Sequence, residues 1–222
     1  MISIAIDGPA GAGKSTISQR IARELGFIYV DTGALYRAIG LFARENNIPE
    51  TDHVLLGPRL KEIKIEIHYW QGRQLIFLNG RDVSNDIRKP EIGMAASNAS
   101  ALPVVRDFLL ELQRDMASKY NAIMDGRDIG TVVLPGADLK IFLTASPEDR
   151  AKRRHLEFVA KGNTIGYQQV LADIRLRDAA DMNRDIAPLK PAPDAVILDT
   201  TGNTFAQSVD LVLKVIRERG IR

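Results

Sequence analysis

Five short apolar segments recur along the chain and are separated by longer stretches with amphipathic periodicity. These segments are Ile2–Asp7, Phe27–Val30, Ala122–Asp125, Leu139–Leu143 and Ala195–Leu198. Short runs that are mostly apolar are typical of strands buried in a parallel sheet, and the amphipathic stretches between them predict helices on both of its faces. The pattern therefore predicts an α/β fold with a central five-stranded parallel sheet flanked by helices.

One segment, Ile63–Val83, departs from this rhythm and alternates apolar with polar residues. Turn signals interrupt the alternation at Gln71-Gly72 and at Asn79-Gly80. Alternation with a period of two, punctuated by such turns, is typical of antiparallel hairpins, so we expect a small antiparallel insertion here. We expect His68 and Trp70 within it to be packing residues without a chemical role.

Three helices have clear boundary signals. The helical pattern Thr16–Leu25 follows the first strand, and a helix that starts at Ser146-Pro147, followed by two acidic residues, is expected to stop near Gly162. A final amphipathic helix is expected from about Thr204 to Arg219, most simply with a structural role. Its apolar face carries Val209, Val212, Leu213 and Ile216.

The segment Gly8–Ser15 reads GPAGAGKS and lies between the first strand and the first helix. It matches G-x-x-x-x-G-K-S, the spacing of a loop whose backbone N–H groups surround a polyphosphate. In such a loop Lys14 reaches the outer phosphates and Ser15 can hold Mg²⁺. The alternative is a glycine-rich turn that only joins strand to helix. The strand and helix on either side favour binding of a nucleoside triphosphate.

Charged residues follow two other predicted strands, and the carboxyl ends of parallel strands share the edge where ligands of such sheets bind. Arg37 follows the second strand and can anchor a phosphate; the alternative is a solvated helix arginine. After the third strand, Asp125 can orient Mg²⁺ or its water, Arg127 offers a fork for phosphate, and Asp128 can accept from an amino group. The alternative for Arg127 is a local ion pair with either aspartate. We expect Thr32 to cap the helix that carries Arg37.

Two later segments carry arginines at helical spacing. Arg150, Arg153 and Arg154 are expected to form one basic stripe, and Arg177, Asp181 and Arg184 lie at i, i+4 and i+7 of the next helix. Together they suggest a helical lid whose arginines neutralise the charge of a phosphoryl group during transfer. The alternative is a pair of solvated helices joined by ordinary surface ion pairs.

Composition narrows the function. The 222 residues carry a formal net charge of only +2, which disfavours a positive surface that binds nucleic acid without sequence preference. The chain has no cysteine and only three scattered histidines, so a zinc site is disfavoured as well. No apolar run approaches the roughly 20 residues that span a bilayer, and the first strand begins at Ile2, which leaves no room for a signal peptide. We therefore expect a cytoplasmic protein with no membrane partner. The Asn-Lys-x-Asp signature of guanine-nucleotide switches is absent from the sequence.

Four motifs together resemble the cytidylate kinase family of nucleoside monophosphate kinases, and the similarity covers essentially the whole chain. They are GPAGAGKST (8–16), DTGALYR (31–37), DGRDIGTVV (125–133) and RDAADMNR (177–184). The resemblance implies a P-loop kinase fold with one kinase domain, 1–222. Its expected parts are a core (1–60, 104–145 and 188–222), a monophosphate-binding insertion (about 61–103) and a lid (about 146–187).

The resemblance also implies roles for particular residues. ATP would be bound by the phosphate loop, whose residues are Gly8, Pro9, Ala10, Gly11, Ala12, Gly13, Lys14, Ser15 and Thr16. The acceptor phosphate would be held by Arg37, Arg127 and Arg184, the ribose by Arg177 and Asp181, and the base by Ser97, Arg106 and Asp128. Thr32 and Tyr36 would also contact CMP. Arg154 would be the lid arginine nearest the transferred group, so that Lys14, Arg127, Arg154 and Arg184 form the catalytic set, with Ser15 and Asp125 at the metal.

These observations predict a kinase that uses Mg²⁺ and ATP to phosphorylate CMP and dCMP to the diphosphates. No histidine lies near the motifs, which suits an acceptor that needs no general base, because a monophosphate is mostly dianionic at neutral pH. We expect a monomer that binds no nucleic acid. Two alternatives stay open: a kinase for another monophosphate or small metabolite, and a P-loop ATPase stimulated by nucleic acid.

Overall fold

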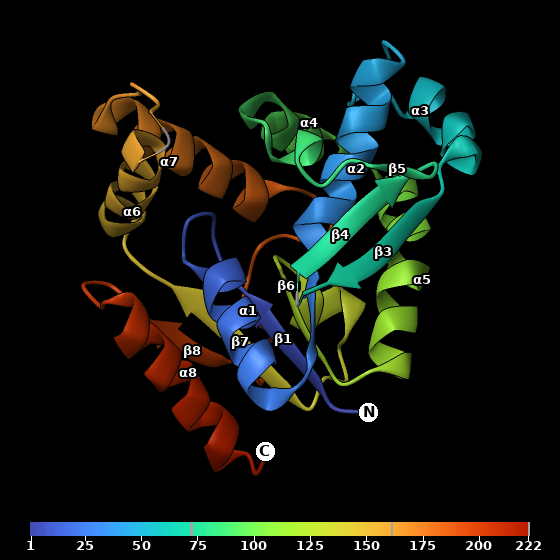
Figure 1. Cartoon of the computed structure of the whole chain (residues 1–222). Coiled ribbons are helices and arrows are strands. Elements are labelled where there is room, and N and C mark those ends of the chain that lie inside the picture. The colour runs from blue at the N-terminus through green and yellow to red at the C-terminus, as the bar shows by residue number, and fades with distance from the viewer. Residues whose placement is uncertain (72, 161, 222) are drawn as a thin grey trace. The chain divides into compact units, whose positions relative to one another are not determined.

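The structure, a computed structural model, describes residues 1–71, 73–160 and 162–221 (Figure 1). It divides into two compact units, the first formed by Met1–Tyr29 with Tyr120–Arg222 and the second by Val30–Lys119. The predicted subdivision into core, insertion and lid stays a prediction.

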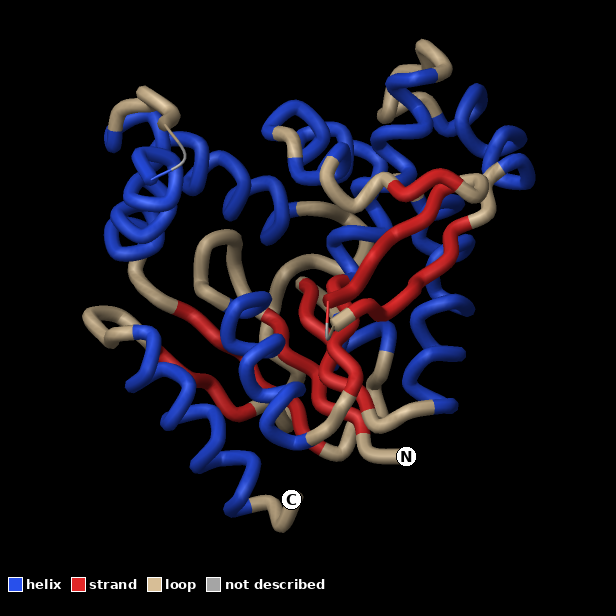
Figure 2. Tube along the Cα trace, in the orientation of Figure 1, coloured by secondary structure: helices blue, strands red, loops and turns tan. Residues whose placement is uncertain are grey.

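The predicted parallel sheet is present, and Figure 2 draws its strands, like all strands, in red; the first unit holds this sheet except for Val30 and Asp31 of β2, which belong to the second. The strand order is β2-β6-β1-β7-β8, so β1 is the central strand and pairs with both β6 and β7. All five predicted strands are confirmed, with boundaries that differ by one residue or less. The strands are β1 (Ser3–Asp7), β2 (Ile28–Asp31), β6 (Ala122–Gly126), β7 (Leu139–Thr144) and β8 (Val196–Asp199).

The helices of the first unit are α1 (Lys14–Leu25), α6 (Pro147–Ala160), α7 (Tyr167–Asn183) and α8 (Phe205–Glu218). Helices α1 and α8 pack side by side on one face of the sheet (Figure 1), and their buried residues share a core with β1 and β7. Thr204 caps α8 through a capping box with Gln207, and the predicted apolar face of this helix is buried. The structural role predicted for the final helix is confirmed.

The second unit contains the predicted antiparallel insertion. Its sheet has the order β3-β4-β5, and the helix α2 packs closely against α4. A core of aliphatic side chains, which includes Leu35, Ile39, Leu56, Ile76 and Leu109, joins these elements. The elements are α2 (Thr32–Glu45), α3 (His53–Arg59), β3 (Ile65–Trp70), β4 (Arg73–Leu78), β5 (Arg81–Asp82), α4 (Pro90–Ser100) and α5 (Pro103–Lys119).

The insertion has two predicted turns, Gln71-Gly72 and Asn79-Gly80, and the structure describes the second of them in full. Asn79 and Gly80 both have positive φ (50° and 81°), as a tight hairpin turn between β4 and β5 requires. In the other turn Gln71 is described and Gly72 lies outside the described residues. The packing role expected for Trp70 is wrong, because its side chain is 65% exposed at the end of β3. His68 is also exposed, although its ring meets the edge of Phe77 across the hairpin.

Within the described parts of the chain, no helix combines the length and the apolar character needed to span a bilayer.

The close packing of α2 on α4 depends on Gly40. A Cβ at this position would lie 3.0 Å from both the backbone and the Cβ of Ala95. We expect Gly40→Ala to lower the free energy of unfolding by about 1–3 kcal/mol, the usual cost of overpacking, despite the better helix propensity of alanine. Urea denaturation measures the change.

Gly93 of α4 is the matched control, since nothing lies within 4 Å of the place its Cβ would take. Gly93→Ala should raise the free energy of unfolding by about 0.5–1 kcal/mol, because only the helix propensity changes. Equal effects of the two substitutions would contradict the packing described for Gly40.

Candidate active site

The phosphate loop, Gly8–Ser15, crosses the sheet edge between the ends of β1 and β7. Gly8 has a φ of +147°, and a Cβ there would lie 1.9 Å from the carbonyl oxygen of Leu143 in β7. Only glycine can occupy that position, because the backbone conformation and the close approach both exclude a side chain. The helix α1 begins at Lys14, two residues before the predicted start, so the last two residues of the loop form its first turn.

Lys14 is buried beneath the loop. Its Nζ donates a hydrogen bond of 2.8 Å to the carbonyl oxygen of Pro9. The pKa of Lys14 is lowered from 10.5 to about 7, mainly by burial and in addition by the positive charge of Arg127. The carboxylates of Asp125, Asp7 and Asp181 act in the opposite direction. The ammonium group therefore lacks the anion that would fully stabilise its charge.

Ser15 and Asp125 meet directly, as their proposed shared role requires. Ser15 Oγ donates to Asp125 Oδ2 at 2.7 Å, and the Tyr29 hydroxyl donates to Asp125 Oδ1 at 2.8 Å. Among the described residues, no group of three or more His, Cys, Asp or Glu side chains is placed to hold a metal alone. Mg²⁺ bound together with phosphates needs only one or two protein oxygens, and these two residues offer oxygens of the right type.

Asp7 is a residue of this site that the sequence analysis missed. It ends β1 with 3% exposure, and its two oxygens each accept one backbone hydrogen bond of 2.7 Å: Oδ1 from Ile129 and Oδ2 from Gly130. Burial raises the pKa of Asp7 from 3.8 to about 6, although both hydrogen bonds act to lower it. A signal was present in the sequence, since a carboxylate ends an otherwise apolar buried strand.

Arg127 and Asp128, which we call the β6 loop, follow β6 at the same edge of the sheet. Arg127 Nε bonds Asp181 Oδ2 of α7 at 2.7 Å, so the ion pair joins distant segments, unlike the local pair that the sequence left open. Arg184 Nη2 lies 3.8 Å from Asp128 Oδ1, and its Nε donates to the carbonyl oxygen of Ala187. The structure thus brings together the charged residues of two separate motifs.

The expected shared helical face of Arg177, Asp181 and Arg184 is partly wrong. Helix α7 ends at Asn183, and Arg184 has extended backbone angles (φ −69°, ψ 142°) just beyond it. Leaving the helix lets the Arg184 side chain turn toward Asp128, which a regular i+7 position does not require. Arg177 lies within α7 and is half-buried.

The predicted basic stripe on α6 is also wrong, because its three arginines have three different surroundings. Arg150 is buried; its guanidinium bonds Asp178 of α7 at 2.7 Å and donates to the carbonyl oxygens of Ala10 and Ala145. It therefore fastens the phosphate loop to the two helices. Arg153 donates to the carbonyl oxygen of Thr200.

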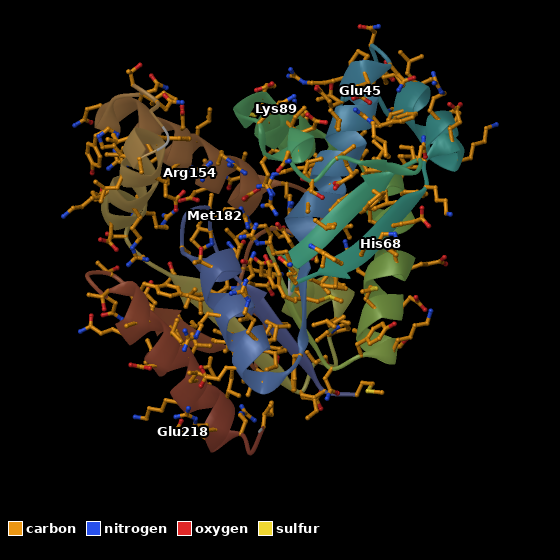
Figure 3. The ribbon with its side chains drawn as sticks, viewed as in Figure 1. Glu45, His68, Lys89, Arg154, Met182 and Glu218 are labelled. Carbon is orange, nitrogen blue, oxygen red and sulfur yellow. The ribbon has the colours of Figure 1, made fainter. Side chains whose placement is uncertain are left out.

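Arg154, which Figure 3 labels on α6, is exposed and pairs with Glu157 at 2.9 Å. Its guanidinium also lies 4.6 Å from the centre of the Phe158 ring. Exposed ion pairs of this kind contribute about 0–1 kcal/mol, so the side chain can exchange them for a ligand at little cost.

The second unit carries the remaining predicted residues. Asp31, not Thr32, caps α2: its Oδ1 accepts from the backbone N–H of Ala34, and Thr32 is the first helical residue, so the expected capping role of Thr32 is wrong. Arg37 lies one turn farther, 3.9 Å from Asp31 Oδ2, which also binds Arg88 at 2.9 Å. Asp31 is thus a buried anion between two arginines.

Ser97 and Arg106, the predicted base-reading residues of this unit, lie on α4 and α5. Arg106 is buried; it donates to the carbonyl oxygen of Ser100 at 3.2 Å, and its guanidinium is 5.9 Å from the Tyr36 ring centre. The backbone oxygen of Ser97 accepts from the hydroxyl of Ser100. These contacts hold Tyr36, Ser97 and Arg106 in one part of the second unit.

The parallel sheet, the phosphate loop after its central strand and the arginine-bearing segments at its edge define a P-loop kinase. A solved gluconokinase from Sinorhizobium meliloti 1021 shares this fold: it superposes with a TM-score of 0.50 at 16% sequence identity, over 98% of this chain and 92% of that chain.

Sequence comparison is more specific. A family model described as cytidylate kinase matches residues 4–218. A cytidylate kinase of Caldicellulosiruptor bescii is 50% identical over 96% of this chain and 95% of the relative, and one of Thermosipho melanesiensis is 47% identical over 97% of each. The chain belongs to the cytidylate kinase family.

The low pKa of Lys14 has a measurable consequence. At pH 8, a pKa of about 7 leaves Lys14 mostly neutral, and a bound polyphosphate should restore its proton by supplying negative charge. We expect uptake approaching about one proton when Mg-ADP binds. Calorimetric titration in buffers of different ionisation enthalpy measures that uptake.

Two variants serve as controls for this measurement. Lys14→Arg should abolish the uptake, since a guanidinium stays protonated, and Lys61→Arg on an exposed turn should leave it unchanged. A binding enthalpy of the wild type that is the same in all buffers would show that Lys14 is already charged before the nucleotide binds.

Proposed function

We propose that this chain transfers the γ-phosphoryl group of ATP to CMP and dCMP. The observation that carries the proposal is the placement of two motifs at the ends of adjacent strands. The phosphate loop follows β1, the β6 loop follows β6, and Asp7 and Gly126 are register partners. Donor and acceptor groups are therefore expected at one edge of one sheet.

The donor is assigned to the phosphate loop. We propose that backbone N–H groups from Gly8 to Thr16 bind the phosphates of ATP and that Lys14 lies against the outer ones. The contact between Ser15 and Asp125 supports a role for both oxygens in holding Mg²⁺. When bound, Mg²⁺ would neutralise charge on the phosphate oxygens.

The acceptor phosphate is assigned to Arg127, Arg184 and Arg37. Arg127 and Arg184 are already held at the sheet edge by carboxylates, and a phosphate dianion offers the same bidentate partner. An oxygen of the CMP phosphate attacks the γ-phosphorus while the bond to the bridging oxygen of ADP breaks. Because the attacking oxygen already carries negative charge, no side chain must remove a proton.

The base is assigned to Asp128, Ser97 and Arg106. A carboxylate accepts from the exocyclic amine of cytosine, while serine and arginine can donate to its ring nitrogen and carbonyl oxygen. Uracil has a carbonyl oxygen where cytosine has the amine. Two hydrogen-bond acceptors would then face each other at Asp128, which disfavours binding of UMP. The ribose is assigned to Arg177 and Asp181.

The other proposed contacts come from Arg154, Thr32 and Tyr36. The weak surface pairing of Arg154 supports a role as a lid arginine that turns to the transferred group. Thr32 and Tyr36 share α2 with Arg37, so their contacts with CMP would accompany its phosphate contact. We further propose that the chain acts as a monomer and binds no nucleic acid; its formal net charge of only +2 supports the second point.

A panel of acceptors tests the proposal most directly. With Mg-ATP as donor, we expect CMP and dCMP to be phosphorylated with much higher kcat/KM than UMP or AMP, because uracil has no amine to donate to Asp128 and adenine has no carbonyl oxygen to accept from Ser97 or Arg106. Preferred turnover of AMP, of UMP or of a metabolite without a base would contradict the assignment. ATP consumption stimulated by RNA and not by CMP would replace it with the ATPase alternative.

Arg127→Ala should raise the KM for CMP about tenfold or more, since a charge-assisted hydrogen bond to phosphate contributes about 1.5–3 kcal/mol. Binding of Mg-ADP should change little. Because this substitution leaves Asp181 buried without its partner, urea denaturation of the variant is measured beside the kinetics and separates lost stability from lost phosphate binding.

The control for Arg127 is Arg175→Ala, which removes an exposed arginine of α7 that pairs with Glu148. It should leave both kinetic constants unchanged. A normal KM for CMP in the folded Arg127→Ala variant would refute the role of Arg127.

Asp128→Asn should reduce the preference for CMP over UMP about tenfold or more, because an amide can donate to the carbonyl oxygen of uracil where a carboxylate cannot. The ratio of kcat/KM for the two substrates reports the change. Asp173→Asn on the exposed side of α7 is the matched control. An unaltered ratio in Asp128→Asn would remove Asp128 from base recognition.

A further inference from the structure

Asp7 holds the β6 loop from both of its ends. The backbone of Asp7 lies in register with Gly126, the residue that precedes Arg127. Its side chain accepts hydrogen bonds from Ile129 and Gly130, the residues that follow Asp128. Asp7 of the neighbouring strand thus contacts the chain both before and after Arg127 and Asp128, the two residues of the β6 loop.

The bonded N–H groups belong to a short π-helical turn, Ile129–Val133. The first N–H groups of a helical turn have no partner within it, and here the carboxylate of Asp7 accepts two of them. The carbonyl oxygen of Asp128, just before this turn, accepts from the N–H groups of Val132 and Val133 at its end, at 2.9 and 3.2 Å. The backbone on both sides of the Asp128 peptide is therefore fixed.

The contact is also sterically close. A Cβ on Gly130 would lie 3.3 Å from Asp7 Oδ2 and 3.1 Å from Cδ of Lys140. The groups whose charge acts on the carboxylate are Asp128, which disfavours its ionised form, and Lys14, which favours it. A buried apolar side chain could pack here without any charge, so packing alone does not account for a carboxylate with two matched donors.

We propose that Asp7 is a positioning residue for CMP recognition: it touches no nucleotide, but it sets the direction in which Arg127 and Asp128 leave the sheet. This role rests on the proposed function, because it deepens the assignment of Arg127 to the phosphate and of Asp128 to the base. Lost alignment of a base-reading group weakens discrimination between bases, whereas a purely structural contact changes only the stability of the fold.

Asp7→Asn tests the role. The amide keeps the size of the side chain but has one acceptor oxygen, so its NH₂ group faces one of the two backbone N–H donors. We expect the KM for CMP to rise about tenfold and the ratio of kcat/KM for CMP over UMP to fall about tenfold. The Kd for Mg-ADP should change less than the KM for CMP, because the two hydrogen bonds of the Asp7 side chain go to Ile129 and Gly130, whereas it acts on Lys14 through charge alone.

Gly130→Ala approaches the same contact from the other side and keeps the test available if Asp7→Asn does not fold. The added methyl group separates Gly130 from Asp7 while every charge stays in place. We expect the same direction of change in the CMP-to-UMP ratio. Asp138→Asn is the matched control, because Asp138 accepts from the N–H of Ser3 at the opposite end of β1. It should leave the ratio unchanged.

Hydrogen exchange of the peptide that contains Ile129 and Gly130 gives a readout independent of turnover. Both variants should exchange these amides faster than the wild type. Faster exchange in either folded variant with an unchanged CMP-to-UMP ratio overturns the positioning role and leaves the proposed function intact. A wild type without preference for CMP over UMP contradicts the proposed function itself, and the role of Asp7 in CMP recognition with it.

Discussion

The burial of charge at the edge of the sheet is the constraint on which this structure depends. Asp7 and Asp125 are buried at the carboxyl ends of β1 and β6, and Lys14 is buried at the start of α1; a charge without partners would be costly at each place. Each has specific hydrogen-bond partners: two backbone N–H groups for Asp7, a loop carbonyl for Lys14, and two hydroxyls for Asp125. These contacts fix the two loops that carry the proposed chemistry.

The charged contacts of the first unit are of two kinds. Arg150 bonds Asp178 and two carbonyl oxygens while fully enclosed, and loss of any partner would leave a buried charge, so its role is structural. Lys14 and Arg127 are held less completely. Burial keeps the pKa of Lys14 near 7. The shortest hydrogen bond of Arg127 goes to the carboxylate of Asp181. The phosphate of a nucleotide can supply an anionic partner to both side chains. This explains why two buried or half-buried positive charges are placed together.

The sequence predicted most of the fold, because short apolar strands and a phosphate loop depend on local spacing. It failed where a side chain's partner is distant. Arg150 was grouped with Arg154 by helical spacing, yet the first is buried against Asp178 and the second is exposed. Asp7 is marked in the sequence as a carboxylate that ends an apolar strand, but its partners are the backbone N–H groups of Ile129 and Gly130, and the side chains of these residues give no sign of the contact.

Smaller errors have the same origin. Asp31 and Thr32 are both good capping residues, and only the position at which α2 begins decides between them. Arg184 has the right spacing for the face of α7 but follows the end of the helix. Trp70 has the composition of a core residue and yet lies exposed, since nothing in the alternation of β3 shows which hairpin positions are covered.

The ionisation of Asp7 tests this view of the sheet edge most directly. With aspartate labelled by ¹³C at Cγ, the resonance of Asp7, assigned by its loss in Asp7→Asn, can be followed by NMR as the pH is changed. We expect a titration midpoint of about 6, because burial outweighs the two backbone hydrogen bonds. A midpoint at or below the ordinary value of 3.8 would show that the two backbone hydrogen bonds fully offset the cost of burial, so that this charge imposes no constraint on the structure, and would contradict the central claim.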